Sequence, residues 1–116
     1  MLADVDDETK KVDVREAARA ADAGEVLLVD VREDEEWAAG RAPTAVHAPM
    51  SRLRQDTLPK DRRVLAICRV GGRSAAVTEA LDQLGYDVAD VPGGMLAWSA
   101  AGLPVVREGG APGTVV

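Results

Sequence analysis

Apolar residues alternate between two patterns along this chain, and the alternation predicts strands separated by helices. Near-continuous apolar runs over residues 26–31 and 64–67 are typical of strands buried inside a parallel sheet, and a last strand is expected over 86–91. Apolar residues at helical spacing predict a helix over residues 75–84, which Gly85 ends. The sequence therefore predicts an α/β fold, with a mostly parallel central sheet of about five strands and helices on both faces.

Local signals predict shorter elements around these strands. Asp13 and Glu16 match a capping-box pattern, which begins a helix that Gly24 ends. The other expected elements are a short helix, a brief strand, a helical turn and a closing helix, at residues 34–39, 45–47, 53–58 and 95–101.

The length of 116 residues leaves room for one domain with a packed core. Residues 1–9 are acidic and are expected to form a flexible tail. Residues 107–116 are rich in glycine and are expected to form a second flexible tail. The folded domain is therefore expected to span residues 10–106.

Composition and charge exclude several classes of function. The net charge of −6 argues against nucleic acid as the main partner. No apolar run approaches the about 20 residues of a membrane span, so no membrane partner is expected. One cysteine cannot form an internal disulfide, and with one histidine beside it the sequence predicts no metal site and no cofactor. The expected compartment is a reducing cytoplasm.

The basic residues are unevenly distributed, with a concentration between residues 50 and 75. They either form ordinary solvated surface or make a locally positive rim that attracts small anions or an acidic partner. Cys68 lies within this stretch, at the end of a predicted strand.

A short loop with two glycines and two arginines follows Cys68 and leads into the predicted helix. A strand, a tight loop and a helix start gather backbone N–H groups around an anion. A cysteine at the base of such a loop is favoured as thiolate over thiol. The sequence therefore predicts one activated sulfur atom.

Three segments, in this order, match the motifs of one family. They are residues 30–40, 68–73 and 93–105, with the patterns Asp-x-Arg…Glu-aromatic-x-x-Gly, Cys-x-x-Gly-x-Arg and Gly-Gly-x-x-x-Trp…Gly-x-Pro-Val. On these motifs the chain resembles a single-domain rhodanese, a sulfurtransferase. One departure follows Gly40, where the family usually has His-Ile and this chain has Arg41-Ala42. Arg41 either lies near the site mouth or belongs to a segment that packs differently.

The resemblance implies sulfur transfer at Cys68. Its thiolate would attack the outer sulfur of a small anionic donor such as thiosulfate, and the persulfide would pass that sulfur to cyanide or a thiol. Arg73 would face the donor, and Arg69 would recruit it at the rim. A sulfur-trafficking protein is a further expected partner. The residues expected to bind the substrate are Arg69, Val70, Gly71, Gly72 and Arg73.

Three polar residues are expected to support the site, each with an alternative. Asp30 and Arg32 either support the residues that touch the substrate, without touching it themselves, or form an ion pair that stabilises the fold. Ser74 either supplies a catalytic hydroxyl or caps the helix that follows.

Two rival functions remain open. Phosphatases and arsenate reductases of similar fold use a loop one residue longer than the four residues between Cys68 and Arg73. The smaller loop favours sulfur over a tetrahedral oxyanion. The other rival is a rhodanese-like domain that only binds partners, and the intact Cys68 and Arg73 argue against it.

Overall fold

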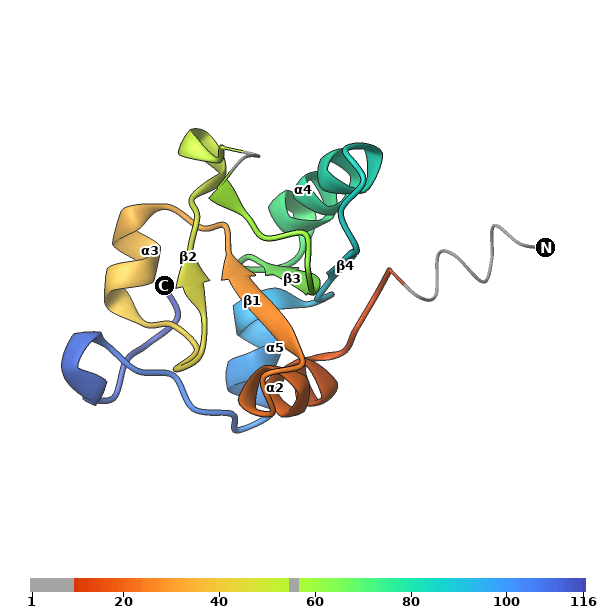
Figure 1. Cartoon of the computed structure of the whole chain (residues 1–116). Helices are drawn as coiled ribbons and strands as arrows, with labels where there is room; N and C mark the ends of the chain where they lie inside the picture. The colour runs from red at the N-terminus through yellow and green to blue at the C-terminus, as the bar shows by residue number, and fades with distance from the viewer. Residues whose placement is uncertain (1–9, 55–56) are drawn as a thin grey trace.

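The sheet at the centre of the molecule has four parallel strands in the order β2-β1-β3-β4 (Figure 1). The structure, a computed structural model, describes residues 10–54 and 57–116. The predicted α/β fold is confirmed, with four strands in the described part where about five were expected. The strands are β1 (Val26–Asp30), β2 (Val46–His47), β3 (Arg63–Ile67) and β4 (Val88–Asp90).

Helices cover both faces of the sheet, as the sequence predicted. Asp13 caps the first of them, because its carboxylate accepts hydrogen bonds from the backbone N–H groups of Arg15 and Glu16. No helix in the described part of the chain is long and apolar enough to cross a membrane. The α-helices are α2 (Val14–Asp22), α3 (Asp34–Ala39), α4 (Gly72–Gln83) and α5 (Gly94–Ala100), and the 3₁₀ helices are η1 (Met50–Arg52) and η3 (Glu108–Gly110).

The helical turn expected over residues 53–58 is only partly described. The 3₁₀ helix η1 lies before it, at Met50–Arg52. Gln55 and Asp56 lie outside the described residues.

The side chains of β3 alternate between two separate halves of the core. Leu65 and Ile67 belong to the half that includes Ala17 of α2 and Met95 and Trp98 of α5. Val64 and Ala66 belong to the half that includes the buried apolar residues of α4. Because successive side chains of a strand point to opposite faces, Cys68 continues the second series and lies on the α4 side.

An ion pair at the end of β1 is completely buried. Both side chains, Asp30 and Arg32, have no exposed surface. The guanidinium of Arg32 donates to the two carboxylate oxygens of Asp30 at 2.7–3.1 Å. Its Nη2 also donates to the carbonyl oxygen of Gly40 at 2.6 Å. The pair therefore fixes the chain at the end of α3 against the end of β1.

The C-terminal segment runs back along this part of the fold. The backbone N–H of Thr114 donates to the carbonyl of Ala39 at 2.9 Å, and Val106 bridges to Arg41. A Cβ atom added to Gly40 would lie 2.7 Å from the backbone nitrogen of Thr114. The close approach of the C-terminal segment to the end of α3 therefore needs glycine at position 40. The segment thus has defined contacts with the domain, while the expected flexibility of residues 107–116 stays a prediction.

Replacing Asp30 tests how much the buried pair contributes. We expect Asp30→Asn to lower the free energy of unfolding by about 3 kcal/mol, because it leaves the buried guanidinium without a counter-charge. Asp34→Asn is the matched control, since Asp34 pairs with Arg52 at 2.8 Å on the surface, with 61% of its side chain exposed. Asp34→Asn should reduce the stability much less than Asp30→Asn, because an exposed ion pair contributes little. Urea unfolding of the three proteins measures both values, and equal costs would contradict the stabilising role.

Candidate active site around Cys68

The sulfur atom of Cys68 is enclosed by polar groups of the loop that follows it. Cys68 comes directly after β3 and has only 1% of its surface exposed. The backbone N–H of Gly71 donates to Sγ, with the nitrogen 3.0 Å from the sulfur. The Ser74 hydroxyl oxygen lies 3.3 Å from the same sulfur. The buried sulfur thus has two polar neighbours that can stabilise a negative charge.

Helix α4 begins earlier than expected, at Gly72 instead of residue 75. Gly71 is its N-cap and has a φ of 123°, in the range that favours glycine. Ser74 therefore lies in the first helical turn and does not occupy the capping position. Its hydroxyl donates to the carbonyl oxygen of Gly71 at 3.2 Å, beside the sulfur. The positive end of the α4 dipole lies at the same place, which favours an anionic sulfur.

Helix α5 holds the loop from its other side. The backbone N–H groups of Met95 and Leu96 donate to the carbonyl oxygens of Cys68 and Arg69, at 2.7 and 3.0 Å. A Cβ atom on Gly94 would collide with the Cys68 carbonyl and lie 2.6 Å from that of Arg69. The sequence motif contained Gly94 but gave no reason for it. The close approach of α5 to the loop carbonyls supplies that reason.

Arg73 is engaged by a partner that the sequence reasoning did not assign to the site. Its two terminal nitrogens donate to the two carboxylate oxygens of Glu36, at 2.7 and 2.8 Å. This hydrogen bonding lowers the pKa of Glu36 to about 2. The pKa of Arg73 is raised, first by Glu36 and more weakly by the charge of Cys68. The only sign in the sequence that Glu36 could belong to the site was its position in the motif of residues 30–40.

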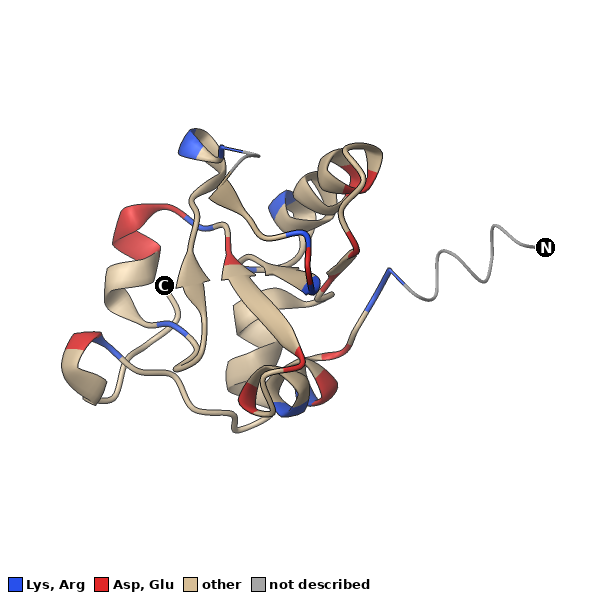
Figure 2. Ribbon diagram, viewed as in Figure 1, with Lys and Arg blue, Asp and Glu red and all other residues tan. Residues whose placement is uncertain are grey.

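The positive rim expected around the loop is partly neutralised. Figure 2 shows the acidic first turn of α3, which holds Asp34 and Glu36. Asp34 accepts a hydrogen bond from Arg52, and Glu36 pairs with Arg73. Two of the basic residues between 50 and 75 are therefore paired with acidic residues of α3.

The remaining loop residues form the outer edge of the site. Arg69 is exposed, and its Nε donates to the carbonyl oxygen of Val116 at 3.0 Å. The Val70 side chain is also exposed, at 55%. The loop thus places the sulfur inside and Arg69 and Val70 at the surface. The substrate-binding roles of residues 69–73 stay predictions.

The supporting residues separate into two groups. Ser74 contacts the sulfur, whereas Asp30 and Arg32 form the buried ion pair that holds Gly40. The structure therefore favours the stabilising role for that pair. Within residues 10–54 and 57–116, no group of three or more His, Cys, Asp or Glu side chains is placed to hold a metal ion.

Arg41, the residue at the departure from the family motif, packs on an aromatic pair. Its guanidinium carbon lies 4.5 Å from the centre of the Trp37 ring. The other neighbour of Trp37 is His47, whose ring stacks on it with centroids 4.6 Å apart. Such a contact between a guanidinium and an aromatic face is favourable. The atypical segment after Gly40 is thereby anchored to α3.

Comparison with known proteins agrees with this geometry. The family model of the rhodanese-like domain matches residues 13–101. The chain belongs to this family. A putative sulfurtransferase, YtwF of Bacillus subtilis, is 45% identical over 82 residues, which cover 69% of this chain and 80% of that protein. A sulfurtransferase of Allochromatium vinosum is 43% identical over 95 residues, which cover 79% of this chain and 89% of that protein.

Solved structures place this rhodanese-like domain in the same family. A rhodanese-related protein from Thermoplasma volcanium matches with a TM-score of 0.79 and 33% identity, over 85% of this chain and 99% of that one. The resemblance stated from the sequence is thus confirmed. The chain is a rhodanese-like protein of the sulfurtransferase type, with a single cysteine directly after β3.

The Glu36–Arg73 pair should make stability depend on pH. The folded-state pKa of Glu36, about 2, lies below its ordinary value of 4.5, so the pair stabilises the fold above pH 4.5 and loses this effect as the pH falls toward 2. We expect Glu36→Gln to cost about 1 kcal/mol at pH 7, a value reduced because part of the pair is exposed to solvent.

The measurement is urea unfolding of Glu36→Gln and the wild type between pH 7 and 3. The difference between the two proteins should shrink as the pH falls below about 5. Glu35→Gln, an exposed position in the same helical turn, is the control and should show no such trend. A difference that stays constant over the whole pH range would contradict the assignment.

Proposed function

We propose that this protein transfers sulfane sulfur from a small anionic donor such as thiosulfate to a thiophilic acceptor, through a persulfide on Cys68. The acceptor is cyanide or a thiol. The membership of the rhodanese-like family and the sulfurtransferase relatives support the reaction class. The specific donor and the persulfide intermediate are inferences from the site.

The environment of the sulfur is the observation that carries this proposal. A single buried sulfur accepts a backbone N–H from Gly71 at 3.0 Å and lies 3.3 Å from the Ser74 hydroxyl, at the start of α4. These neighbours favour an anion without any histidine base. Both forms of the sulfur in the proposed cycle, thiolate and persulfide, are anions that this environment suits.

Each half of the cycle forms one bond to sulfur and breaks another. The Cys68 thiolate attacks the outer sulfur of thiosulfate, a new S–S bond forms, and sulfite leaves with the electron pair of the bond that breaks. The acceptor then attacks the outer sulfur of the persulfide, and Cys68 leaves as thiolate. The covalent intermediate divides the transfer into two displacements.

The geometry argues against phosphate or arsenate chemistry at this site. Only four residues separate Cys68 from Arg73, which is a short loop for an oxyanion. Glu36 occupies one N–H group on each terminal nitrogen of Arg73, and the remaining N–H groups can still bind an anionic sulfur donor. A single transferable sulfur atom needs less space and fewer hydrogen-bond donors than a phosphate or arsenate group.

The proposed cell compartment and partners follow from the same chemistry. We propose a reducing cytoplasm, because a persulfide cycle needs a free thiol. The partners in this proposal are small sulfur donors, thiols and a sulfur-trafficking protein, and neither nucleic acid nor a membrane takes part.

Replacing Cys68 tests the covalent step. Cys68→Ser should reduce thiosulfate–cyanide activity to the uncatalysed level, because a hydroxyl is a far weaker nucleophile toward sulfur. Its free energy of unfolding should stay within about 1 kcal/mol of the wild type, since the two side chains are similar in size. Intact mass after treatment with thiosulfate should rise by one sulfur atom in the wild type only. An equal activity in both proteins would overturn the proposal.

Comparing two arginine variants tests how the donor is held. Arg73→Ala should lower kcat/KM for thiosulfate by about ten- to a hundredfold, the loss of a charge-assisted hydrogen bond worth roughly 1.5–3 kcal/mol. Arg69→Ala should cost less, because salt screens attraction at an exposed rim. The loss in Arg73→Ala should be smaller for a neutral sulfur donor.

Glu36→Gln separates donor binding from the ion pair. It removes the carboxylate that Arg73 contacts but keeps the guanidinium in place. If Glu36→Gln reduces thiosulfate turnover as much as Arg73→Ala does, Arg73 acts by holding Glu36 and not by holding the donor.

A further inference from the structure

Two buried polar side chains away from the Cys68 loop each have a hydrogen-bonding atom without a partner. They are Asp90, the last residue of β4, and Thr78 of α4, which are only 8% and 5% exposed. Within the described part of the chain, Asp90 Oδ1 and Thr78 Oγ1 make no hydrogen bond. Buried polar atoms of this kind are costly, so the two atoms mark a place where a ligand can supply the missing hydrogen bonds.

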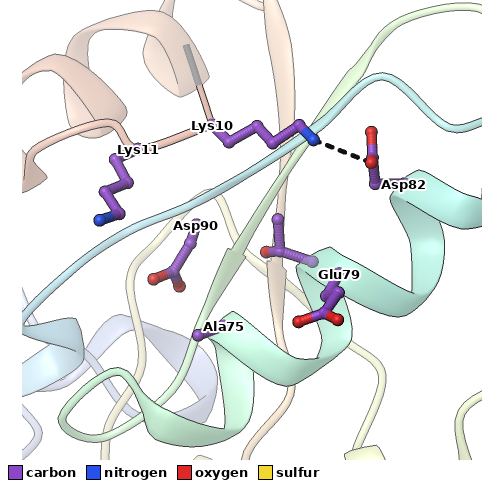
Figure 3. A pocket seen from close by; sticks show the side chains of 7 residues that line it. Lys10, Lys11, Ala75, Glu79, Asp82 and Asp90 are labelled. Atoms are coloured by element: carbon purple, nitrogen blue, oxygen red, sulfur yellow. Dashed lines mark hydrogen bonds and ion pairs between the residues drawn. The ribbon is translucent and has the colours of Figure 1, made fainter. Parts of the chain in front are cut away.

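Both residues line the same pocket, which has a volume of about 400 Å³. The pocket lies between α4, the end of β4 and the segment of residues 10–12 (Figure 3). The backbone of that segment is bound to β4, since the N–H of Asp90 donates to the carbonyl of Lys10 at 2.7 Å and the N–H of Val12 donates to the carbonyl of Asp90 at 2.9 Å. Small-molecule sites have volumes of about 300–1,000 Å³, so this pocket has room for a small ligand.

The pocket carries charges of both signs. Lys10 and Asp82 neutralise each other in an ion pair at 2.9 Å. The buried carboxyl group of Asp90 then remains, together with the exposed side chains of Glu79 and Lys11. Burial raises the pKa of Asp90, and the positive charge of Lys11 lowers it more weakly. A complementary ligand therefore has a positive group for Asp90 and a negative group for Lys11.

An ammonium group suits the buried wall of the pocket. It has three N–H donors, enough for Asp90 Oδ1 and Thr78 Oγ1 together. Its hydrogen bond to a carboxylate is charge-assisted and therefore stronger than a neutral one. The acidic side chains here do not suit a metal ion, because no group of three or more His, Cys, Asp or Glu among residues 10–54 and 57–116 is placed to hold one.

We propose that this pocket binds a small zwitterion of the α-amino-acid type, with its ammonium group on Asp90 and Thr78 and its carboxylate toward Lys11. The ammonium group gives both unpaired buried atoms a partner and compensates the buried carboxylate. Lys11 is exposed and lies beside Asp90 in the backbone pairing, so its side chain can close on the carboxylate from the solvent side. The site differs from the Cys68 loop in its residues and in its chemistry.

Three small probes separate the two charged groups of such a ligand. L-alanine has both, ethylamine lacks the carboxylate and propionate lacks the ammonium group. Titration of the ¹⁵N-labelled protein at pH 7, followed by the NMR shifts of the amides in α4 and β4, measures each dissociation constant. We expect about 1–10 mM for alanine. Ethylamine should bind about threefold more weakly, because an exposed ion pair adds little, and propionate about tenfold or more.

Variants of the two buried residues test the contacts of the ammonium group. Asp90→Asn keeps the shape of the side chain but removes its charge, and it should weaken alanine binding by about tenfold. Thr78→Val should weaken alanine binding by about threefold. The same substitution should leave the melting temperature unchanged or raise it, because it removes a buried hydroxyl that has no partner in the described part of the fold. A hydroxyl with only a structural role would give a lower melting temperature and unchanged binding.

Lys11→Met tests the contact with the carboxylate. It should weaken the binding of alanine by about threefold and leave that of ethylamine unchanged. The matched control is Asp87→Asn, because Asp87 is an exposed carboxylate next to β4 that pairs with Arg63 at 3.4 Å and does not line the pocket. This control should bind alanine as the wild type does.

Thermal unfolding shows whether each variant is folded, and Thr78→Val and Lys11→Met keep the test valid if Asp90→Asn is not. The absence of saturable shifts with alanine up to about 100 mM would overturn the proposal. Binding of ethylamine or propionate as tight as that of alanine, or unchanged alanine binding in folded Asp90→Asn, would also overturn it. None of these results bears on the persulfide, which the mass measurement on Cys68 tests separately.

Discussion

The sulfur atom of Cys68 accepts a hydrogen bond from the backbone of its own loop, and much of the structure serves to keep that loop in place. The Gly71 N–H points at the sulfur because Gly71 has a positive φ and α4 begins directly after it. The carbonyl oxygens of Cys68 and Arg69 accept hydrogen bonds from N–H groups of α5. A backbone N–H aimed at the sulfur and carbonyl groups bound elsewhere suit the loop to an anion.

The apolar pattern was sufficient to predict the architecture. The strands and most helices lie where the apolar runs and the helical spacing of apolar residues predicted them. A parallel sheet that is covered on both faces imposes these patterns on the sequence. The start of α4 was misplaced by three residues, from 75 to 72. Glycine and arginine carry no apolar periodicity, so the spacing of the helix gave no sign that Gly72 and Arg73 belong to it.

The candidate site was predictable only in part. Cys68 and the loop after it could be found from composition and local order, since the thiol is unique and follows a buried strand. Glu36 could not, because it reaches the site from α3, far from Cys68 in the sequence. Its contact with Arg73 depends on how α3 and α4 pack, which local patterns do not specify. The buried pair of Asp30 and Arg32 was recognised, but only the structure shows that it binds Gly40.

The alternation along β3 links the loop to both halves of the core. Ile67 is part of the half beneath α5, and Cys68, the next residue, is part of the half beneath α4. One helix contributes donors close to the sulfur, and the other binds the carbonyl groups on the opposite side. Displacing the loop backbone would therefore break its hydrogen bonds to α5 and disturb the start of α4. The exposed side chains of Arg69 and Val70 can change conformation without breaking any of these backbone contacts.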